Sequence, residues 1–243
     1  MLLHVVGPAG RRRADDPLAE PRHRLNAFAA GDLRYFNTSL QCLTGDDPAS
    51  DIQSAAKSWN ADLIMIPSHG LGTFRRMMLG SVAAKVLHDA ACPVWTSVHA
   101  EHAPALEDIH CRRVLCAVDL SPRSRGIISW AGWIAKTCGA SLGIVHAVAP
   151  WPSVYGEGLE MAFSQTITRQ ASNRTIALKC DAGVEGEVFT SSGEPSQVIA
   201  GVTKKFGADL LVIGRHSGTG ISQYIGQHAY SIIRHSPCPV ISI

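Results

Sequence analysis

Two glycine-rich segments hold the residues of this sequence whose types and spacing could bind a ligand. The first runs over 67–72 and leads on to a Gly-Ser pair at 80–81. The second runs over 214–220 and leads on to a Gly-Gln pair at 226–227. Glycine allows the backbone to approach a ligand closely, and a following helix offers free N–H groups and the positive end of its dipole. Each segment therefore predicts an anion site. Neither is a Walker loop, since no Gly-Lys-Ser/Thr occurs.

Other residue patterns argue against catalytic and metal chemistry. The sequence shows no nucleophile–base pair and no paired carboxylates at a loop, so we expect that the protein is not an enzyme. This expectation leaves incidental ATP hydrolysis open. His99, His102 and His110 with Cys111 do not have the spacing of a zinc site, and this stretch is interpreted as a solvated connector. The seven cysteines form no CxxC pair, which favours a reducing compartment and buried thiols.

Composition narrows the class of protein further. The chain has 243 residues, of which 46% are hydrophobic and 17% charged, so it can bury a core. A net charge of +2 gives no reason to expect a nucleic-acid or membrane partner. No apolar run approaches the ~20 residues of a membrane helix, and the start does not resemble a leader peptide. A cytoplasmic protein is the expectation.

The two glycine segments belong to two copies of one longer repeat. Residues 61–66 match 208–213, and the Cys-Pro-Val sequence at 92–94 recurs at 238–240. Residues 2–6 match 144–148, again in the same order along the chain. Several blocks that keep their order and near-constant spacing indicate a tandem duplication. We predict a first domain at 1–98, a linker at 99–112 and a second domain at 113–243.

The second copy shows strands and helices in strict alternation. Strands are predicted at 113–118, 144–148, 184–190, 210–213 and 239–243, and helices from Ser121-Pro122 to Cys138, over 159–180, from Glu194-Pro195 to Gly207 and over 224–234. Continuous apolar strands separated by helices predict an α/β fold with a doubly wound parallel sheet. Ligands of such sheets lie at the carboxyl ends of the strands, where the strand order reverses.

The first copy lacks a counterpart of 113–140, its opening strand and helix. One interpretation is a truncated sequence whose repeat starts upstream, and the other is a genuinely degenerate copy. Truncation is favoured, because a central parallel strand is buried on both faces and its loss leaves backbone groups unpaired.

Two pairs of side chains are predicted to be structural. Trp130 and Trp133 lie three residues apart on a predicted helix, which places them on one face, and we expect both to pack in the core. His4 and His146 occupy the same position of the repeated strand, and we expect both to be buried and hydrogen-bonded.

A combination of these motifs resembles the universal stress protein family over nearly the whole chain. It consists of Ser-His-Gly at 68–70, nine residues, Gly-Ser at 80–81, a helix ending at 92–94, and Val-Asp at 118–119 after the first strand of the second copy. The resemblance implies two tandem flavodoxin-like sheets. It also implies that the last strands, 94–98 and 240–243, pair with each other, so that the two domains form an intramolecular pseudo-dimer. The resemblance leaves open whether the chain also forms homo-oligomers.

The resemblance further implies an adenine nucleotide, ATP or AMP, as a regulatory ligand. Carried over by position, the cofactor-binding residues are Asp119, Ala147, Gly214, Gly218, Gly226 and Gln227 in the second copy, and Val5, Gly70, Gly80 and Ser81 in the first. Each copy departs from the family's pattern. Pro67 replaces the first glycine of one loop, and Gln227 replaces a Ser/Thr after the other, which is also one residue short.

Because the first copy has no aspartate-bearing opening strand, the second copy is the better candidate for the nucleotide site. The alternative is a scaffold that binds no nucleotide, in which each glycine segment only joins a strand to a helix.

Overall fold

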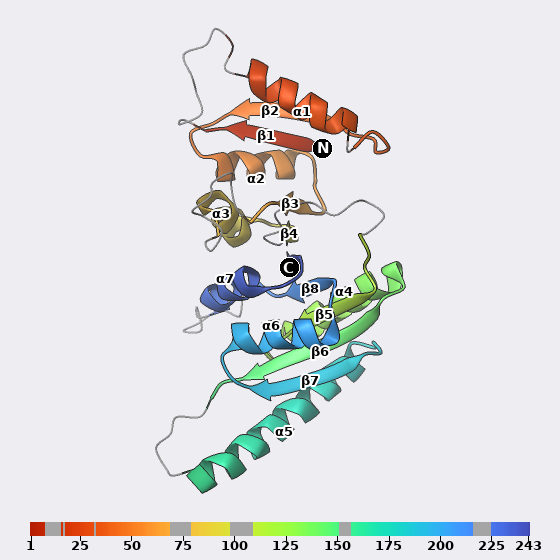
Figure 1. Cartoon of the computed structure of the whole chain (residues 1–243), viewed down its shortest axis with the longest axis vertical. Helices are drawn as coiled ribbons and strands as arrows, with labels where there is room; N and C mark the ends of the chain where they lie inside the picture. The colour runs from red at the N-terminus through yellow and green to blue at the C-terminus, as the bar shows by residue number, and fades with distance from the viewer. Residues whose placement is uncertain are drawn as a thin grey trace. The chain divides into compact units, whose positions relative to one another are not determined.

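The computed structural model describes residues 1–7, 16, 18–31, 33–68, 79–97, 109–150, 157–215 and 225–243, without the side chains of 157–163 and 225–227. The chain divides into two compact units, Met1–Asp62 and Leu63–Ile243. Most of their elements are labelled in Figure 1. Gly70 and Gly218, both predicted site residues, lie outside the described residues.

The smaller unit is a pair of parallel strands with two helices. Its elements are β1 (Leu2–Val6), α1 (Ala19–Gly31), β2 (Leu40–Thr44) and α2 (Pro48–Ser58). The two strands pair from Leu2↔Leu40 to Val6↔Thr44. The expectation that His4 is buried is wrong. Its side chain is exposed on a strand that has only one partner strand among the described residues.

The larger unit is built on a seven-stranded sheet in the order β3-β4-β9-β8-β5-β6-β7. The strands are β3 (Ile64–Ile66), β4 (Val94–Thr96), β5 (Arg113–Ala117), β6 (Ser141–Val148), β7 (Glu187–Ser192), β8 (Leu210–Ile213) and β9 (Val240–Ser242). The helices are α3 (Ser81–Asp89), α4 (Ser124–Cys138), α5 (Glu157–Asp181), α6 (Pro195–Phe206) and α7 (Ile225–His235).

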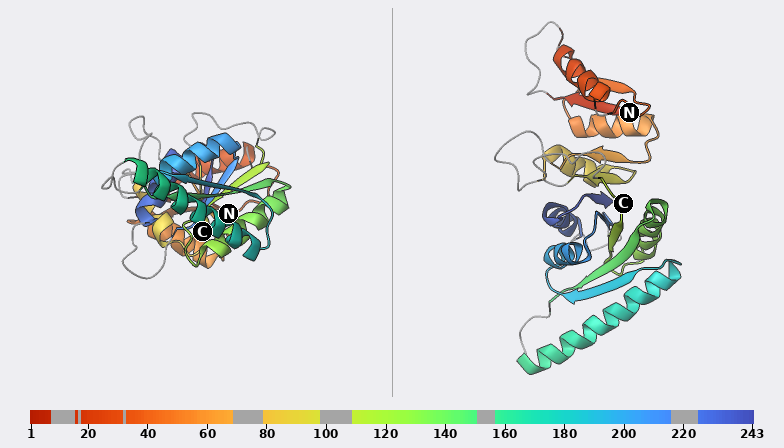
Figure 2. Two further views of the ribbon diagram at one scale, coloured as in Figure 1. Left: turned by 90° about the horizontal axis from the view of Figure 1, so that it is seen from below. Right: turned by 45° about the vertical axis from the view of Figure 1, so that its right-hand side comes forward.

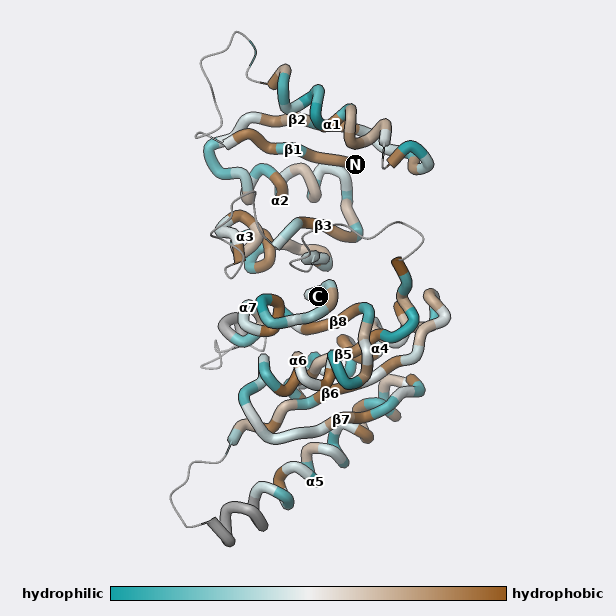
Figure 3. The backbone as a smooth tube through the Cα atoms, in the orientation of Figure 1, coloured by the Kyte–Doolittle hydropathy of each residue, from teal (hydrophilic) through white to brown (hydrophobic). Residues whose placement is uncertain are grey.

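The second copy forms the predicted doubly wound sheet. β5 pairs in parallel with both β6 and β8, so the strand order reverses at β5. α4 and α5 pack together, and α6 packs with α7 against the opposite side of the sheet (Figure 2). The four residues of β8 are all buried, and the colour of the strand in Figure 3 shows that they are hydrophobic. Such burial is what a strand covered on both faces requires.

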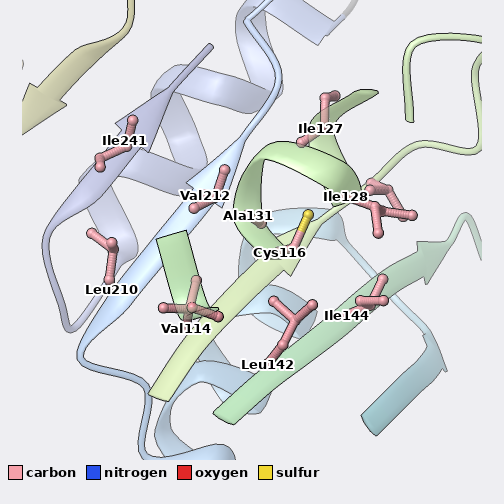
Figure 4. Packing of buried hydrophobic residues seen from close by; sticks show 12 residues of the cluster. Val114, Cys116, Ile127, Ile128, Ala131, Leu142, Ile144, Leu210, Val212 and Ile241 are labelled. Atoms are coloured by element: carbon pink, nitrogen blue, oxygen red, sulfur yellow. The ribbon is translucent and has the colours of Figure 1, made fainter. Parts of the chain in front are cut away.

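The core of the second copy lies between α4 and the strands. Val114, Cys116 and Ile144 are each 0% exposed, and Ile128 of α4 packs over them (Figure 4). Fully burying a side chain of this size contributes about 1.5–3 kcal/mol. This packing fixes the depth of α4 on the sheet, and with it the loop that joins β5 to α4.

The ends of the helices test the sequence prediction closely. Gly139 and Gly207 end α4 and α6 in the left-handed conformation, with φ of 64° and 67°, as predicted. The predicted start of α4 at 121–122 is wrong. The helix begins at Ser124, because the Ser121 amide donates to Asp119 Oδ1 (3.0 Å) and holds 121–123 in a turn. Trp133 is also not in the core but 58% exposed, whereas Trp130 packs against the buried cluster.

The first copy contributes β3, α3 and β4 to the larger unit. In the second copy β5 lies between β6 and β8, but β1 and β3, their counterparts, stand in separate sheets with no described strand joining them. The predicted pairing of the two last strands is confirmed, because β4 runs antiparallel to β9 from Val94↔Ser242 to Thr96↔Val240. The Ser242 and Thr96 hydroxyls each donate to a carbonyl of the other strand, at 3.3 Å.

Candidate functional site

A cavity of about 200 Å³ opens at the carboxyl ends of β5, β6 and β8, where the strand order reverses. Isoleucines at 127, 199, 213 and 232 supply much of its wall. Four polar side chains also line it, namely Asp119, Ser121, His146 and His228. An apolar hollow with a few polar groups is the usual form of a small-molecule site.

Asp119 follows β5 and orders the turn at the floor of this cavity. Its Oδ1 accepts hydrogen bonds from the Ser121 amide (3.0 Å) and the Ser124 hydroxyl (2.9 Å). Partial burial acts to raise the pKa of the Asp119 carboxyl, but the hydrogen bonds from Ser121 and Ser124 outweigh it, and the pKa lies below its ordinary value. Asp119 is therefore ionised at neutral pH and can act only as an acceptor.

The strand β6 extends beyond the end of β5, and Ala147 lies in this extension with its backbone groups. The ladder between these strands ends with the Val118 amide donating to the Val145 carbonyl at 3.0 Å. Successive residues of a strand direct their peptide groups to opposite sides, so those of Ala147 face the same side as those of Val145. The bond from the Gly193 amide to the Val148 carbonyl (2.9 Å) places the alternate residues toward β7. A donor and an acceptor of Ala147 thus stand side by side beyond the end of β5.

His146 is held against the end of β5 beside Ala147. Its Nδ1 lies 2.9 Å from the Val118 carbonyl oxygen, to which it donates. In the neutral ring the lone pair then resides on Nε2. The side chain is half-buried rather than buried, but it is hydrogen-bonded as predicted.

Gly214 follows β8 and packs tightly against α4. A Cβ at this position would lie 2.6 Å from Ile127 Cδ1, so a side chain would meet the cavity wall. Gly214 is not among the described glycines with positive φ. The glycine is needed here for close packing rather than for an unusual backbone conformation.

His228 and Glu194 form a pair at the rim that sequence reasoning missed. Glu194 caps α6 by accepting from the Gln197 amide (3.0 Å) and from the Ser196 hydroxyl. The Ser196 bond is the main cause that lowers the pKa of the Glu194 carboxyl, and the nearby His228 adds to it. His228 Nδ1 lies 3.8 Å from Glu194 Oε1. The available signal was the position of His228 in the first turn of the helix that follows the glycine loop.

The remaining predicted site residues are dispersed. Gly226 and Gln227 stand in the first turn of α7, and the Gln227 side chain is outside the described part of the chain. Gly80 precedes α3, and its amide donates to the Ser68 carbonyl at 2.9 Å, while Ser81 begins α3 and is exposed. Val5 lies in β1 of the smaller unit. The structure thus gathers Asp119, Ala147 and Gly214 around one cavity in the second copy.

Two further features were searched over the described residues. Among them, no three His, Cys, Asp or Glu side chains come together in a group that could hold a metal ion. Within the same part of the chain, no helix is long and apolar enough to cross a membrane.

Comparisons with known proteins agree with the repeat and the fold. The model of the universal stress protein family matches residues 3–97 and again 110–243. The chain is 29% identical over 140 residues to universal stress protein A homolog 1 of Coxiella burnetii, which covers 56% of this chain and 97% of that protein.

Solved structures resemble the whole chain. A universal stress protein from Archaeoglobus fulgidus DSM 4304 has a TM-score of 0.64 at 23% identity, covering 100% of this chain and 85% of the other. A protein from Pseudomonas aeruginosa UCBPP-PA14 has a TM-score of 0.68 at 20% identity, covering 100% and 92%. At these identities the likeness shows the fold.

Proposed function

Because the chain belongs to the universal stress protein family, we propose that its second copy binds an adenine nucleotide, ATP or AMP, as a regulatory ligand. One observation carries the proposal. Asp119, Ala147 and Gly214, which lie far apart in the sequence, line the same cavity at the point where the strand order reverses. Ligands of doubly wound sheets bind at such points.

The groups around the cavity complement the polar edge of adenine. That edge carries an amino group that donates and a ring nitrogen that accepts. The Ala147 carbonyl and amide offer the opposite pair, and the Asp119 carboxylate offers a further acceptor. Ile127 and Ile213 supply apolar surface for the faces of the base.

The phosphates would extend toward the start of α7. A cavity of about 200 Å³ is smaller than the roughly 300–1,000 Å³ that encloses a drug-sized ligand, so it suits the base and part of the ribose. The helix α7 begins at Ile225, next to Gly226, and its N-terminus carries free amides and a positive dipole end. His228, which lines the cavity from the same helix, stands close to this path.

Calorimetry with ATP and AMP tests the proposal. Asp119→Asn removes the charged acceptor but keeps an oxygen for the turn, and hydrogen bonds to charged groups contribute about 1.5–3 kcal/mol, so affinity should fall at least tenfold. Asp181→Asn is the matched control, because Asp181 is an exposed aspartate of the same copy outside the cavity lining. The proposal would be contradicted if Asp119→Asn bound ATP and AMP as tightly as this control does.

A second candidate function is a scaffold that works by joining the two copies without a nucleotide. It is supported by the β4–β9 pairing and by side chains that cross between the copies. The Arg215 guanidinium donates to the Leu87 and Cys92 carbonyls at 3.2 and 2.9 Å, and the Tyr230 hydroxyl donates to the Ala84 carbonyl at 3.1 Å.

Native mass spectrometry separates the two functions. A co-purifying or added adenine nucleotide that shifts the mass of the chain supports the first, and a ligand-free chain at millimolar nucleotide supports the second. Neither proposal assigns the chain an enzymatic activity, and incidental ATP hydrolysis in the same samples would remain compatible with the first.

A further inference from the structure

Two long side chains of the second copy reach the part of the first copy that belongs to the larger unit. The Arg215 guanidinium donates through Nη1 to the Leu87 carbonyl at 3.2 Å and through Nη2 to the Cys92 carbonyl at 2.9 Å. The Tyr230 hydroxyl donates to the Ala84 carbonyl at 3.1 Å. The three acceptors lie in α3 or in the turn that joins α3 to β4. One short segment of the first copy therefore receives all of these bonds.

The chemistry of Arg215 suits the acceptors that it contacts. The helix α3 ends at Asp89, so the Leu87 carbonyl is among the last four of the helix, which have no partner within it. A cation is favoured there, because the C-terminal end of a helix carries the negative end of its dipole. Arg215 is only 9% exposed, so these contacts are shielded from water. Arg215 therefore caps the C-terminal turn of α3 from the other copy.

Arg215 and Tyr230 are also close neighbours, along the chain, of residues that line the cavity. Gly214 lines the cavity and directly precedes Arg215. In α7, Ala229 and Ile232 line the cavity on either side of Tyr230 in the sequence. Because an α-helix turns by about 100° per residue, α7 presents one face to the cavity and another to α3. A ligand that contacts the cavity wall therefore acts on the same two segments that hold α3.

The contacts run from the second copy to the first. In the repeat, Ser68 is the counterpart of Arg215, but its hydroxyl donates to the Ser97 carbonyl of its own copy at 3.0 Å. Ala84 is the counterpart of Tyr230 and has no donor in its side chain. In a symmetric pair of subunits each such contact would occur twice. Here the copy that holds the cavity makes the contacts, and the other copy receives them.

We propose that the first copy senses an adenine nucleotide in the cavity through Arg215 and Tyr230, which couple the cavity to α3 and the turn after it. This inference rests on the proposed function, because it takes the nucleotide as the ligand of the cavity. The bound nucleotide holds α7 and the end of β8 where both side chains reach their acceptors, so the turn between α3 and β4 becomes more ordered. Coupling between two sites is reciprocal, and the same contacts therefore strengthen nucleotide binding.

Thiol labelling of the full chain with and without ATP, measured by mass spectrometry after digestion, tests the coupling. Cys92, whose carbonyl accepts from Arg215, is half-buried and lies in the turn that should become more ordered. Cys138, the last residue of α4, is exposed, so the expectation of buried thiols is wrong for it, and it serves as an internal control. Saturating ATP should slow the alkylation of Cys92 by iodoacetamide at least about fivefold and leave that of Cys138 unchanged.

Two variants identify the residues that carry the coupling. In Arg215→Met, ATP should bind at least about fivefold more weakly in calorimetry, and saturating ATP should no longer slow the labelling of Cys92. Tyr230→Phe removes only the hydroxyl and should weaken both effects in the same direction. Arg234→Met removes an exposed cation of α7 and should behave as the wild type does. A purely structural role of Arg215 would lower the stability of the chain but leave the effect of saturating ATP on Cys92 unchanged.

The possible outcomes separate this inference from the proposed function. ATP that binds to the wild type without slowing the labelling of Cys92 would overturn the inference and leave the proposed function standing. So would an Arg215→Met chain in which saturating ATP slows this labelling as much as in the wild type. Absence of ATP binding in calorimetry would refute the proposed function, and the inference with it. If Arg215→Met fails to fold, the wild type and Tyr230→Phe still decide between these outcomes.

Discussion

Replacing Gly214 with alanine tests how the wall of the cavity is packed. The new Cβ would lie 2.6 Å from Ile127 Cδ1 and 3.7 Å from Ile127 Cγ1. Carbon atoms pack best at about 3.5–4.0 Å, so only the Cδ1 methyl is too close, by about 1 Å. Ile127 is 8% exposed, and its Cδ1 is the far end of a side chain that lines the cavity, so rotation of this methyl can relieve part of the overlap. Overpacking costs about 1–3 kcal/mol, and we expect a value near the lower end of this range.

Urea unfolding measures this cost directly. With a cost of about 1 kcal/mol and a slope of about 1–3 kcal/mol per molar urea, the midpoint should fall by about 0.3–1 M. Since Ile127 and Gly214 line the same cavity, nucleotide affinity measured on the same samples should fall as well.

A double-mutant cycle separates the contact with Ile127 from any other role of the glycine. Ile127→Val deletes the Cδ1 methyl and costs about 0.5–1.5 kcal/mol by itself. In that background the alanine Cβ meets only an ordinary contact, so Gly214→Ala should cost much less than in the wild type. Equal costs in both backgrounds would refute the reasoning, because they would show that the glycine is required by its backbone and not by Ile127.

Two further predictions follow from buried or partly buried polar groups. The pKa of Asp119 is lowered in the folded chain, so its ionised form stabilises the fold above the unfolded pKa of about 3.9, and this stability is lost as the pH falls through the folded value. The difference in unfolding free energy between wild type and Asp119→Asn should therefore shrink below about pH 4, and a difference that stays constant down to pH 2 would contradict it. Arg215→Met should destabilise the larger unit by about 1–3 kcal/mol in urea, because the Leu87 and Cys92 carbonyls lose their buried donor. Arg234→Met, at an exposed position of α7, is its control, and equal effects of the two would argue against the role of Arg215.

The sequence by itself determined the repeat, the fold class and most element boundaries of the second copy. Strand and helix periods, and the glycines at 139 and 207 that end helices, act over a few residues and leave a direct trace in the sequence. The continuous apolar run at 210–213 was sufficient to predict a buried strand, and the family resemblance led to the pairing of the last strands. Such features are local, or recur in both copies, and can therefore be found without coordinates.

Only the tertiary structure decided which distant side chains meet. It placed Ala147 beyond the end of β5 and His228 beside Glu194. It also moved the start of α4 to Ser124, because the Asp119 carboxylate captures the Ser121 amide. These contacts depend on the register of parallel strands and on how deeply the helices pack. Both are set by the whole core and by no short stretch of residues.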